Sequence, residues 1–184
     1  MKSALNLIFW GFLFVIVRID IEIDLLPNPI GYLLIASGCI KLQAKFPIVR
    51  RAGTLSTIMI FISIPTIFVN VDQAIGFGWH IYSIALLMLN LILVYFIFTV
   101  LKVIVNNYNN YALSNRTHNL FTVYMSLNLI LLAFLSFSVN VPEDISLTIS
   151  FILAIATLIM NIVFLVLIRA IRRASDSERP NIVL

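Results

Sequence analysis

Long apolar segments alternate with short polar connectors along the whole chain. The segments cover residues of about 4–22, 29–45, 54–71, 80–101, 118–139 and 146–168. Each is close to the roughly 20 residues that a membrane-spanning helix requires. A bilayer admits only helices or closed barrels, and these runs lack the alternation of barrel strands. The pattern predicts an all-α integral membrane helical bundle with six transmembrane helices. One transmembrane domain, 1–168, precedes a basic tail, 169–184.

The stretch FVIVRIDIEIDLLPNPIGYLL interrupts this pattern, because charges alternate with isoleucines. The charged residues are Arg18, Asp20, Glu22 and Asp24. Alternation of this kind is locally typical of a half-buried strand. A first helix that ended before Arg18 would, however, cover about 21 Å of a hydrocarbon core about 30 Å thick. We therefore expect the first helix to continue to about residue 22, with Arg18 and Glu22 as i,i+4 neighbours.

The second apolar segment has a recognisable start. Asn28 is a suitable N-cap, and Pro29 suits the first helical position, where its missing N–H costs nothing. Gly31 and Gly38 are expected on one face of this helix, where they permit close approach by a neighbouring helix. In the third segment Pro65 is expected to kink the helix.

Composition supports the membrane assignment and limits the chemistry. Hydrophobic residues make up 61% of the chain and charged residues 11%, and the mean hydropathy is +1.07. Soluble domains carry about 25% charged residues. The single cysteine, Cys39, excludes an intrachain disulfide and a cysteine-based zinc cluster. The apolar N-terminus resembles a signal peptide without a cleavage site, so we expect an uncleaved helix.

The charged residues are divided between the two predicted membrane faces. Eleven of the twelve basic residues share one face: Lys2, Lys41, Lys45, Arg50, Arg51, Lys102, Arg116, Arg169, Arg172, Arg173 and Arg179. Six of the eight acids lie on the other: Asp20, Glu22, Asp24, Asp72, Glu143 and Asp144. Because basic residues are retained on the cytoplasmic side, both termini are predicted to be cytoplasmic. The same distribution argues against nucleic-acid binding, since these cations flank helix ends.

Two groups of residues are candidates for a ligand site. The first is Arg18 with Asp20, Glu22 and Asp24, since ionisable residues within a span suggest a site. Arg18 and Glu22 either neutralise each other while the remaining acids face water, or the group binds a cation or a cationic ligand. The second group contains Asn90 in the fourth segment and Asn161 in the sixth, which belong to rows of polar and small residues.

Polar and small residues recur at helical spacing in the last two segments. The sixth has Ser146, Ser150, Ala154, Thr157 and Asn161, and the fifth has Thr122, Ser126, Ala133, Ser136 and Asn140. In the fourth segment Ser83 and Asn90 share a face. Such stripes either pack helices closely or line a polar cavity for a substrate.

Catalytic motifs are missing from the sequence. HExxH, GxSxG, Walker and GxGxxG patterns do not occur. The two histidines, His80 and His118, are predicted on opposite membrane faces, where they cannot share a metal. We therefore expect neither an enzyme nor a cofactor or metal centre. The alternative is a metal-dependent site formed by the outer acids.

The segment DLLPNPIGYLLIASG, residues 24–38, resembles one found in small multi-spanning membrane proteins of Gram-positive bacteria. The resemblance covers about fifteen residues and the general layout, and it implies a bacterial plasma membrane. It marks Asp24, Pro27, Asn28, Gly31 and Tyr32 as signature positions. The related segments often have aspartate where this chain has Asn28. The resemblance implies no particular activity.

Three functions remain open at this stage. The first is a non-catalytic membrane protein that acts as an accessory or regulatory partner of another membrane protein in the lipid bilayer. The second is a transport component for a small molecule or ion with an outward-facing site. Its size and topology are similar to those of the substrate-binding subunits of energy-coupling-factor transporters. The third is a membrane enzyme. A transporter is expected to contain a polar cavity, and an accessory protein a filled core.

Overall fold

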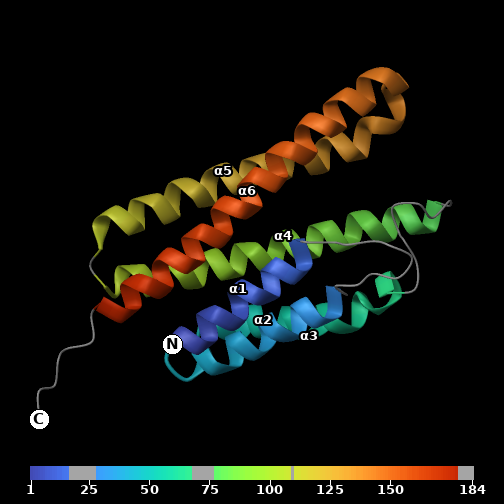
Figure 1. Cartoon of the computed structure of the whole chain (residues 1–184). Coiled ribbons are helices and arrows are strands. Elements are labelled where there is room, and N and C mark those ends of the chain that lie inside the picture. Colours follow the sequence, from blue (N-terminus) through green and yellow to red (C-terminus); the bar gives the residue numbers. More distant parts are fainter. Residues whose placement is uncertain (17–27, 68–76, 109, 178–184) are drawn as a thin grey trace, which may run out of the picture.

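The computed structural model describes residues 1–16, 28–67, 77–108 and 110–177, and every regular element in these ranges is helical (Figure 1). The elements are α1 (Lys2–Ile16), α2 (Asn28–Gln43), α3 (Val49–Ile62), η1 (Ile64–Ile67), α4 (Phe77–Asn106), α5 (Tyr111–Phe137), η2 (Ser138–Asn140) and α6 (Glu143–Ser177). The predicted all-α class is confirmed for this part of the chain.

The number of helices long enough to cross a membrane differs from the prediction. Three of the described helices, α4, α5 and α6, are long and apolar enough, whereas six such spans were expected. At 1.5 Å per residue, the 16 residues of α2 extend about 24 Å and the 14 of α3 about 21 Å. Helix α2 has about the predicted length and is itself short for a span, whereas the third predicted segment, 54–71, continued past the end of α3 at Ile62. The predicted continuation of the first helix to residue 22 lies outside the described residues.

The boundaries of α3 show why the third predicted span was misplaced. Arg50 and Arg51, assigned to a connector, lie in the first turn of α3, because arginine has a high helix propensity. The helix ends at Ile62, ahead of Pro65, and the chain turns into η1. Proline disfavours the helical conformation of the residue before it. Pro65 therefore accompanies the end of the helix and does not kink a longer one.

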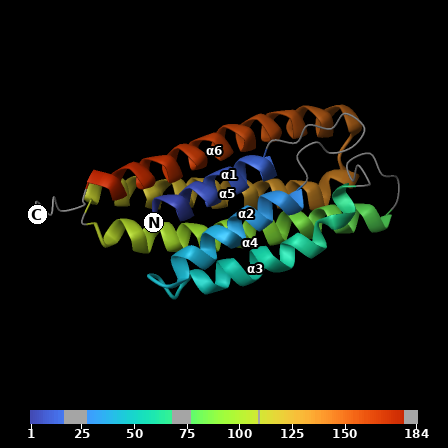
Figure 2. The ribbon, with the colours of Figure 1, turned by 60° about the horizontal axis from the view of Figure 1, so that its bottom comes forward.

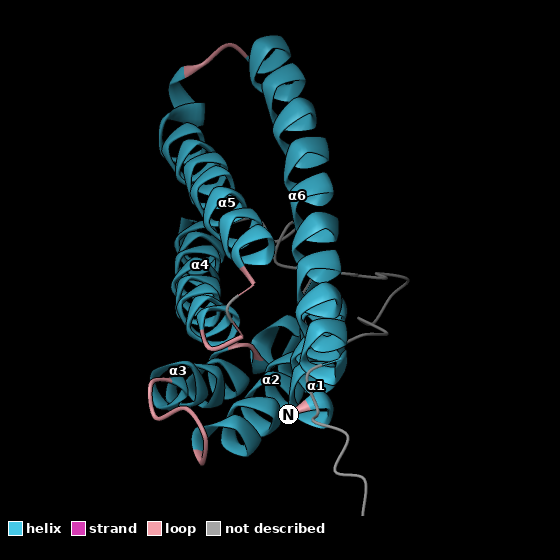
Figure 3. Ribbon diagram, turned by 90° about the vertical axis from the view of Figure 1, so that its left-hand side faces the viewer, coloured by secondary structure: helices cyan, strands magenta, loops and turns pink. Residues whose placement is uncertain are grey.

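Successive helices run in opposite directions (Figure 2). Each of α1 to α5 packs against the next helix in the chain, and α6 also contacts α1. The start of α1 lies at the same end of the bundle as the α2–α3 and α4–α5 connectors and the end of α6 (Figure 2). Glu143 and Asp144 begin α6 at the opposite end. Figure 3 shows the α5–η2–α6 end standing away from α1, α2 and α3.

Polar contacts hold the start of α1 beside the ends of two other helices, α2 and α6. The Arg172 side chain of α6 donates a hydrogen bond to the Asn6 side chain. Lys41 Nζ of α2 donates to Ser3 Oγ over 3.4 Å. These contacts bring basic residues from α2 and α6 to the N-terminal end of α1, in agreement with the predicted grouping of the basic residues at one end of the bundle.

The tightest helix crossing joins α1 to α2 at glycines. A Cβ atom added to Gly11 would lie 2.6 Å from the carbonyl oxygen of Gly31. One added to Gly38 would lie 2.7 Å from the carbonyl oxygen of Ala4. The close approach predicted for Gly31 and Gly38 is therefore confirmed. The partner is α1, which contributes a glycine of its own.

Four aromatic side chains from four helices form the centre of the bundle. Phe12 of α1, Phe98 of α4, Tyr124 of α5 and Phe164 of α6 are all buried. The Phe164 ring centroid lies 5.1 Å from that of Phe12, 4.8 Å from that of Phe98 and 5.7 Å from that of Tyr124. Centroid separations of this size are favourable for aromatic pairs. We refer to these four residues as the aromatic cluster.

Candidate functional site

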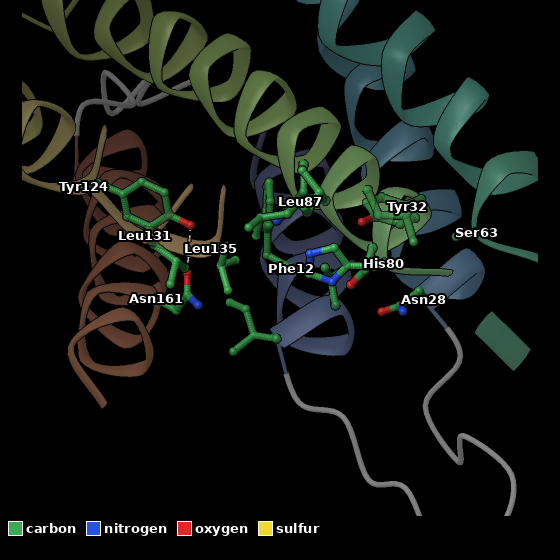
Figure 4. Close-up of a pocket in the computed structure, with 16 residues that line it drawn as sticks. Phe12, Asn28, Tyr32, Ser63, His80, Leu87, Tyr124, Leu131, Leu135 and Asn161 are labelled. Atoms are coloured by element: carbon green, nitrogen blue, oxygen red, sulfur yellow. Dashed lines mark hydrogen bonds between the residues drawn. The ribbon is translucent and has the colours of Figure 1, made fainter. Parts of the chain in front are cut away.

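A cavity of about 570 Å³ lies among helices α1, α2, α4, α5 and α6, beside the aromatic cluster (Figure 4). Its polar lining residues are Asn28, Tyr32, Ser63, His80, Ser83, Asn90, Tyr124 and Asn161. Aliphatic side chains from α1, α4 and α5 complete the wall. Small-molecule sites have volumes of about 300–1,000 Å³ and combine apolar walls with a few polar groups. We call this space the main chamber.

The aromatic cluster closes the main chamber on one side. Phe12 and Tyr124 belong to both, whereas Phe98 and Phe164 lie deeper in the protein. On its other side the chamber is lined by Asn28 at the start of α2 and by exposed His80 near the start of α4. The chamber therefore occupies the half of the bundle near the acidic start of α6 rather than the basic half.

Asn161 faces the main chamber from α6 with one of its amide atoms already bound. Tyr124 OH donates a hydrogen bond to Asn161 Oδ1 over 2.8 Å, which links α5 to α6 (Figure 4). Because the oxygen accepts this bond, the Asn161 Nδ2 group is the atom able to donate to a ligand. The Tyr124–Asn161 bond thus orients the Asn161 amide.

Asn90 of α4 is the second amide residue that lines the main chamber. Its Oδ1 atom is buried and has no hydrogen-bond partner among the described residues. Thr157 Oγ1, one helical turn before Asn161, is likewise buried without a hydrogen-bond partner among the described residues. A buried polar atom without a partner costs about 1–3 kcal/mol, so each of them requires an explanation. Asn90 lines the chamber as a residue, but its Oδ1 atom is covered by protein.

Hydrogen bonds between helix ends hold the wall formed by α2, α3 and α4. Asn28 Nδ2 donates to Thr66 Oγ1 over 3.3 Å, and Thr66 Oγ1 donates to the Ser63 carbonyl oxygen over 2.8 Å. Tyr82 OH donates to the Ile62 carbonyl oxygen over 2.6 Å. The carbonyl groups left free where α3 ends thus have side-chain donors. Asn28, predicted to precede the second helix as its N-cap, is the first residue of α2, and its side chain bonds to Thr66.

A second cavity of about 340 Å³ adjoins the main chamber. It is lined by Ile16 of α1, by Leu131 and Leu135 of α5, and by Ser150, Ala154, Thr157, Leu158 and Asn161 of α6. Four of the stripe residues predicted in the sixth segment therefore line a cavity. We call this space the side chamber.

The stripe predicted in the fifth segment has the opposite orientation. Thr122, Ser126, Ala133, Ser136 and Asn140 are all exposed. Two of the hydroxyls bond to their own helix: Thr122 Oγ1 to the His118 carbonyl and Ser136 Oγ to the Leu132 carbonyl. The buried face of α5 carries Tyr124 and Asn128 instead. This stripe neither packs α5 into the bundle nor lines the main or side chamber.

The candidate site residues divide into three groups. Asn90 and Asn161, on different helices, line the same chamber, together with the signature residues Asn28 and Tyr32. Gly31 packs against α1 and serves helix contact. Arg18, Asp20, Glu22, Asp24 and Pro27 lie outside the described residues.

Sequence reasoning missed the residues that complete the site. Tyr124, Phe12 and Ser63 line the chamber but were not identified as candidates. A phenol within an apolar segment was an available signal for Tyr124, since a buried tyrosine hydroxyl usually finds a partner. Within the described ranges, no group of three or more His, Cys, Asp or Glu side chains is placed to hold a metal ion.

Comparison of the chain with protein-family models, with curated proteins and with solved structures finds no match.

Proposed function

We propose that this chain is a multi-pass membrane protein that binds an uncharged small molecule in the main chamber, as the binding component of a transport process. The observation that carries the proposal is the main chamber itself, a space of ligand size lined by the amide residues Asn90 and Asn161 from two different helices. Asn161 Nδ2 provides a donor in the same chamber. The described lining includes no lysine, arginine, aspartate or glutamate, which favours an uncharged ligand.

The chamber favours the transport role over the accessory role. An accessory protein was expected to have a filled core, whereas this bundle leaves a partly open space of about 570 Å³ beside its aromatic cluster. The described ligand groups of the site are amides, hydroxyls and aromatic rings. No catalytic step forms part of the proposal.

The proposal includes an orientation in the membrane. We infer that α1, α2 and α3 lie in a bacterial plasma membrane with the three longer helices and that both termini are cytoplasmic. Large apolar side chains are exposed on the short helices, among them Ile40 of α2 (65% exposed) and Phe61 of α3 (69%). Lipid would cover these side chains. The main chamber would then lie in the outer half of the bilayer.

Native mass spectrometry of the gently solubilised protein tests the proposal. We expect the wild type to retain a small molecule and the Asn161→Leu variant to lose it, because leucine can neither donate to the ligand nor accept from Tyr124. Asn140→Leu is the matched control, since Asn140 is exposed and lines neither chamber. Absence of a bound molecule in the wild type, or equal retention by Asn161→Leu, contradicts the proposal.

A second candidate function rests on the exposed stripe of α5. Small and hydroxyl side chains such as Ser126, Ala133 and Ser136 allow close helix packing in membranes, and here they face outward. This surface supports association with another membrane protein, which is the accessory role. In the same mass spectrometry experiment, a retained protein chain in place of a small molecule would favour this second function.

A further inference from the structure

The main and side chambers meet at a shared wall. Ile16, Leu131, Leu135 and Asn161 line both of them. Asn161 is the polar member of this shared set, and the other three are aliphatic. A ligand in the main chamber that contacts Asn161 is therefore adjacent to the side chamber, and the two spaces can receive different parts of one molecule.

The side chamber reaches the outer surface of the bundle at α6. Two of its lining residues, Ala154 and Leu158, are exposed, Leu158 to 51%. With a rise of 1.5 Å per residue, they lie about 16 Å and 22 Å along α6 from Glu143. Residues 145–168 carry no charged side chain. In a bilayer whose hydrocarbon core is about 30 Å thick, this opening faces acyl chains rather than water.

The two chambers differ in chemistry. Eight of the sixteen residues that line the main chamber are polar, whereas three of the eight around the side chamber are polar and the other five are leucine, isoleucine or alanine. A wholly polar solute would leave this aliphatic wall without a partner. A wholly apolar one would leave the polar residues of the main chamber, among them Asn90 and Asn161, without a polar partner in the ligand. A molecule with a polar end and an aliphatic end matches both chambers.

We propose that the occupant is an uncharged amphiphile that enters from the bilayer. Its hydroxyl- or amide-bearing head accepts from Asn161 Nδ2 and lies beside Asn90 in the main chamber. Its alkyl chain passes Asn161, follows the side chamber and leaves between α5 and α6 beside Ala154. This inference rests on the proposed function, because it places the head in the same chamber, and it adds the class of ligand and its route.

The test uses 1-monoolein, whose head carries two hydroxyls and an ester, with oleate as a charged comparison of the same chain length. Full-length protein is titrated with each probe and observed by native mass spectrometry. Ala154→Phe fills the side chamber at an exposed helix position. Ala133→Phe makes the same change on the exposed face of α5, where it lines neither chamber.

We expect a single 1-monoolein per chain in the wild type and in Ala133→Phe, and at least about tenfold weaker retention in Ala154→Phe and for oleate. Equal retention of 1-monoolein by Ala154→Phe and Ala133→Phe overturns the proposal of an amphiphilic ligand. Equal retention of oleate and 1-monoolein by the wild type overturns it as well. If Ala154→Phe retains the molecule that co-purifies with the wild type and Asn161→Leu loses it, only the amphiphile is wrong. If no small molecule is retained by any form, the proposed function fails as well.

Discussion

At the scale of single residues, the site depends on the state of two amide side chains. Asn161 has its oxygen bound to Tyr124, whereas Asn90 has its oxygen buried and unpaired. The sequence identified both asparagines, because an amide inside an apolar segment is conspicuous. It could not predict that Tyr124 would orient Asn161, since that contact joins residues 37 positions apart. Periodicity relates residues within one helix and gives no information about contacts between helices.

Gly11 provides a test of the α1–α2 crossing. We expect Gly11→Val to lower the free energy of unfolding by about 3 kcal/mol, since added side-chain atoms must displace the Gly31 backbone or the Ile35 side chain. Gly78→Ala is the control, because a Cβ atom there meets nothing within 4 Å. Equilibrium unfolding in mixed micelles measures both variants. A Gly11→Val variant as stable as Gly78→Ala would show that α1 and α2 can move apart at Gly11 without loss of stability.

At the scale of helices, the sequence predicted which segments are helical better than it predicted where each helix ends or which of its faces is buried. Each of the six predicted segments overlaps a described helix, yet α3 begins five residues before its predicted start at residue 54 and ends at Ile62. Hydropathy responds to apolar side chains, whereas the ends of α3 depend on backbone bonding and on Pro65.

The α5 stripe shows a second limit of the sequence. Its residues do share a face, as the spacing indicated, but that face is exposed. In water an exposed face is polar and a buried face apolar, so composition reveals orientation. Lipid removes this difference, because acyl chains accept apolar side chains as readily as a protein core does. The orientation of α5 therefore required the structure.

Lys102 and Phe121 test the contact between α4 and α5. Lys102 Nζ lies 3.6 Å from the centre of the Phe121 ring, a cation–π arrangement. We expect Lys102→Met, which keeps the length of the side chain, to cost about 0.5–1 kcal/mol of stability. Lys45→Met is the control, since Lys45 lies over the ring of its own neighbour, Phe46, and joins no two helices. Equal unfolding midpoints for the two variants would assign no stabilising role to the α4–α5 pair.

At the scale of the whole molecule, charge distribution and chain direction agree. The sequence assigned Lys41, Arg50 and Arg172 to one face, and the structure brings the α2–α3 connector and the end of α6 to one end of the bundle (Figure 2). An even number of helices running alternately up and down produces this result. Which end faces the cytoplasm is a separate matter, because it depends on the membrane and on insertion.

Cysteine labelling determines that orientation. We expect Glu22→Cys and Glu143→Cys to react with a membrane-impermeant maleimide in intact cells and Arg51→Cys to react only after permeabilisation, because basic residues stay in the cytoplasm. The unmodified chain is the blank, since its one cysteine, Cys39, is buried. Labelling of Arg51→Cys alone in intact cells would reverse the orientation and place the main chamber in the cytoplasmic half.

The contact between the first and last helices determines when the bundle can close. Asn6 and Arg172 are separated by 166 positions, so at about 5–20 residues per second roughly 8–33 s of translation pass between them. Until then the α6-facing side of α1, including Phe12, lacks the helix against which it packs. The candidate ligand site is also incomplete until α6 has been synthesised, because Asn161 is part of α6. A ribosome that stalls within the last helix would release a protein with inserted helices and an incomplete binding chamber.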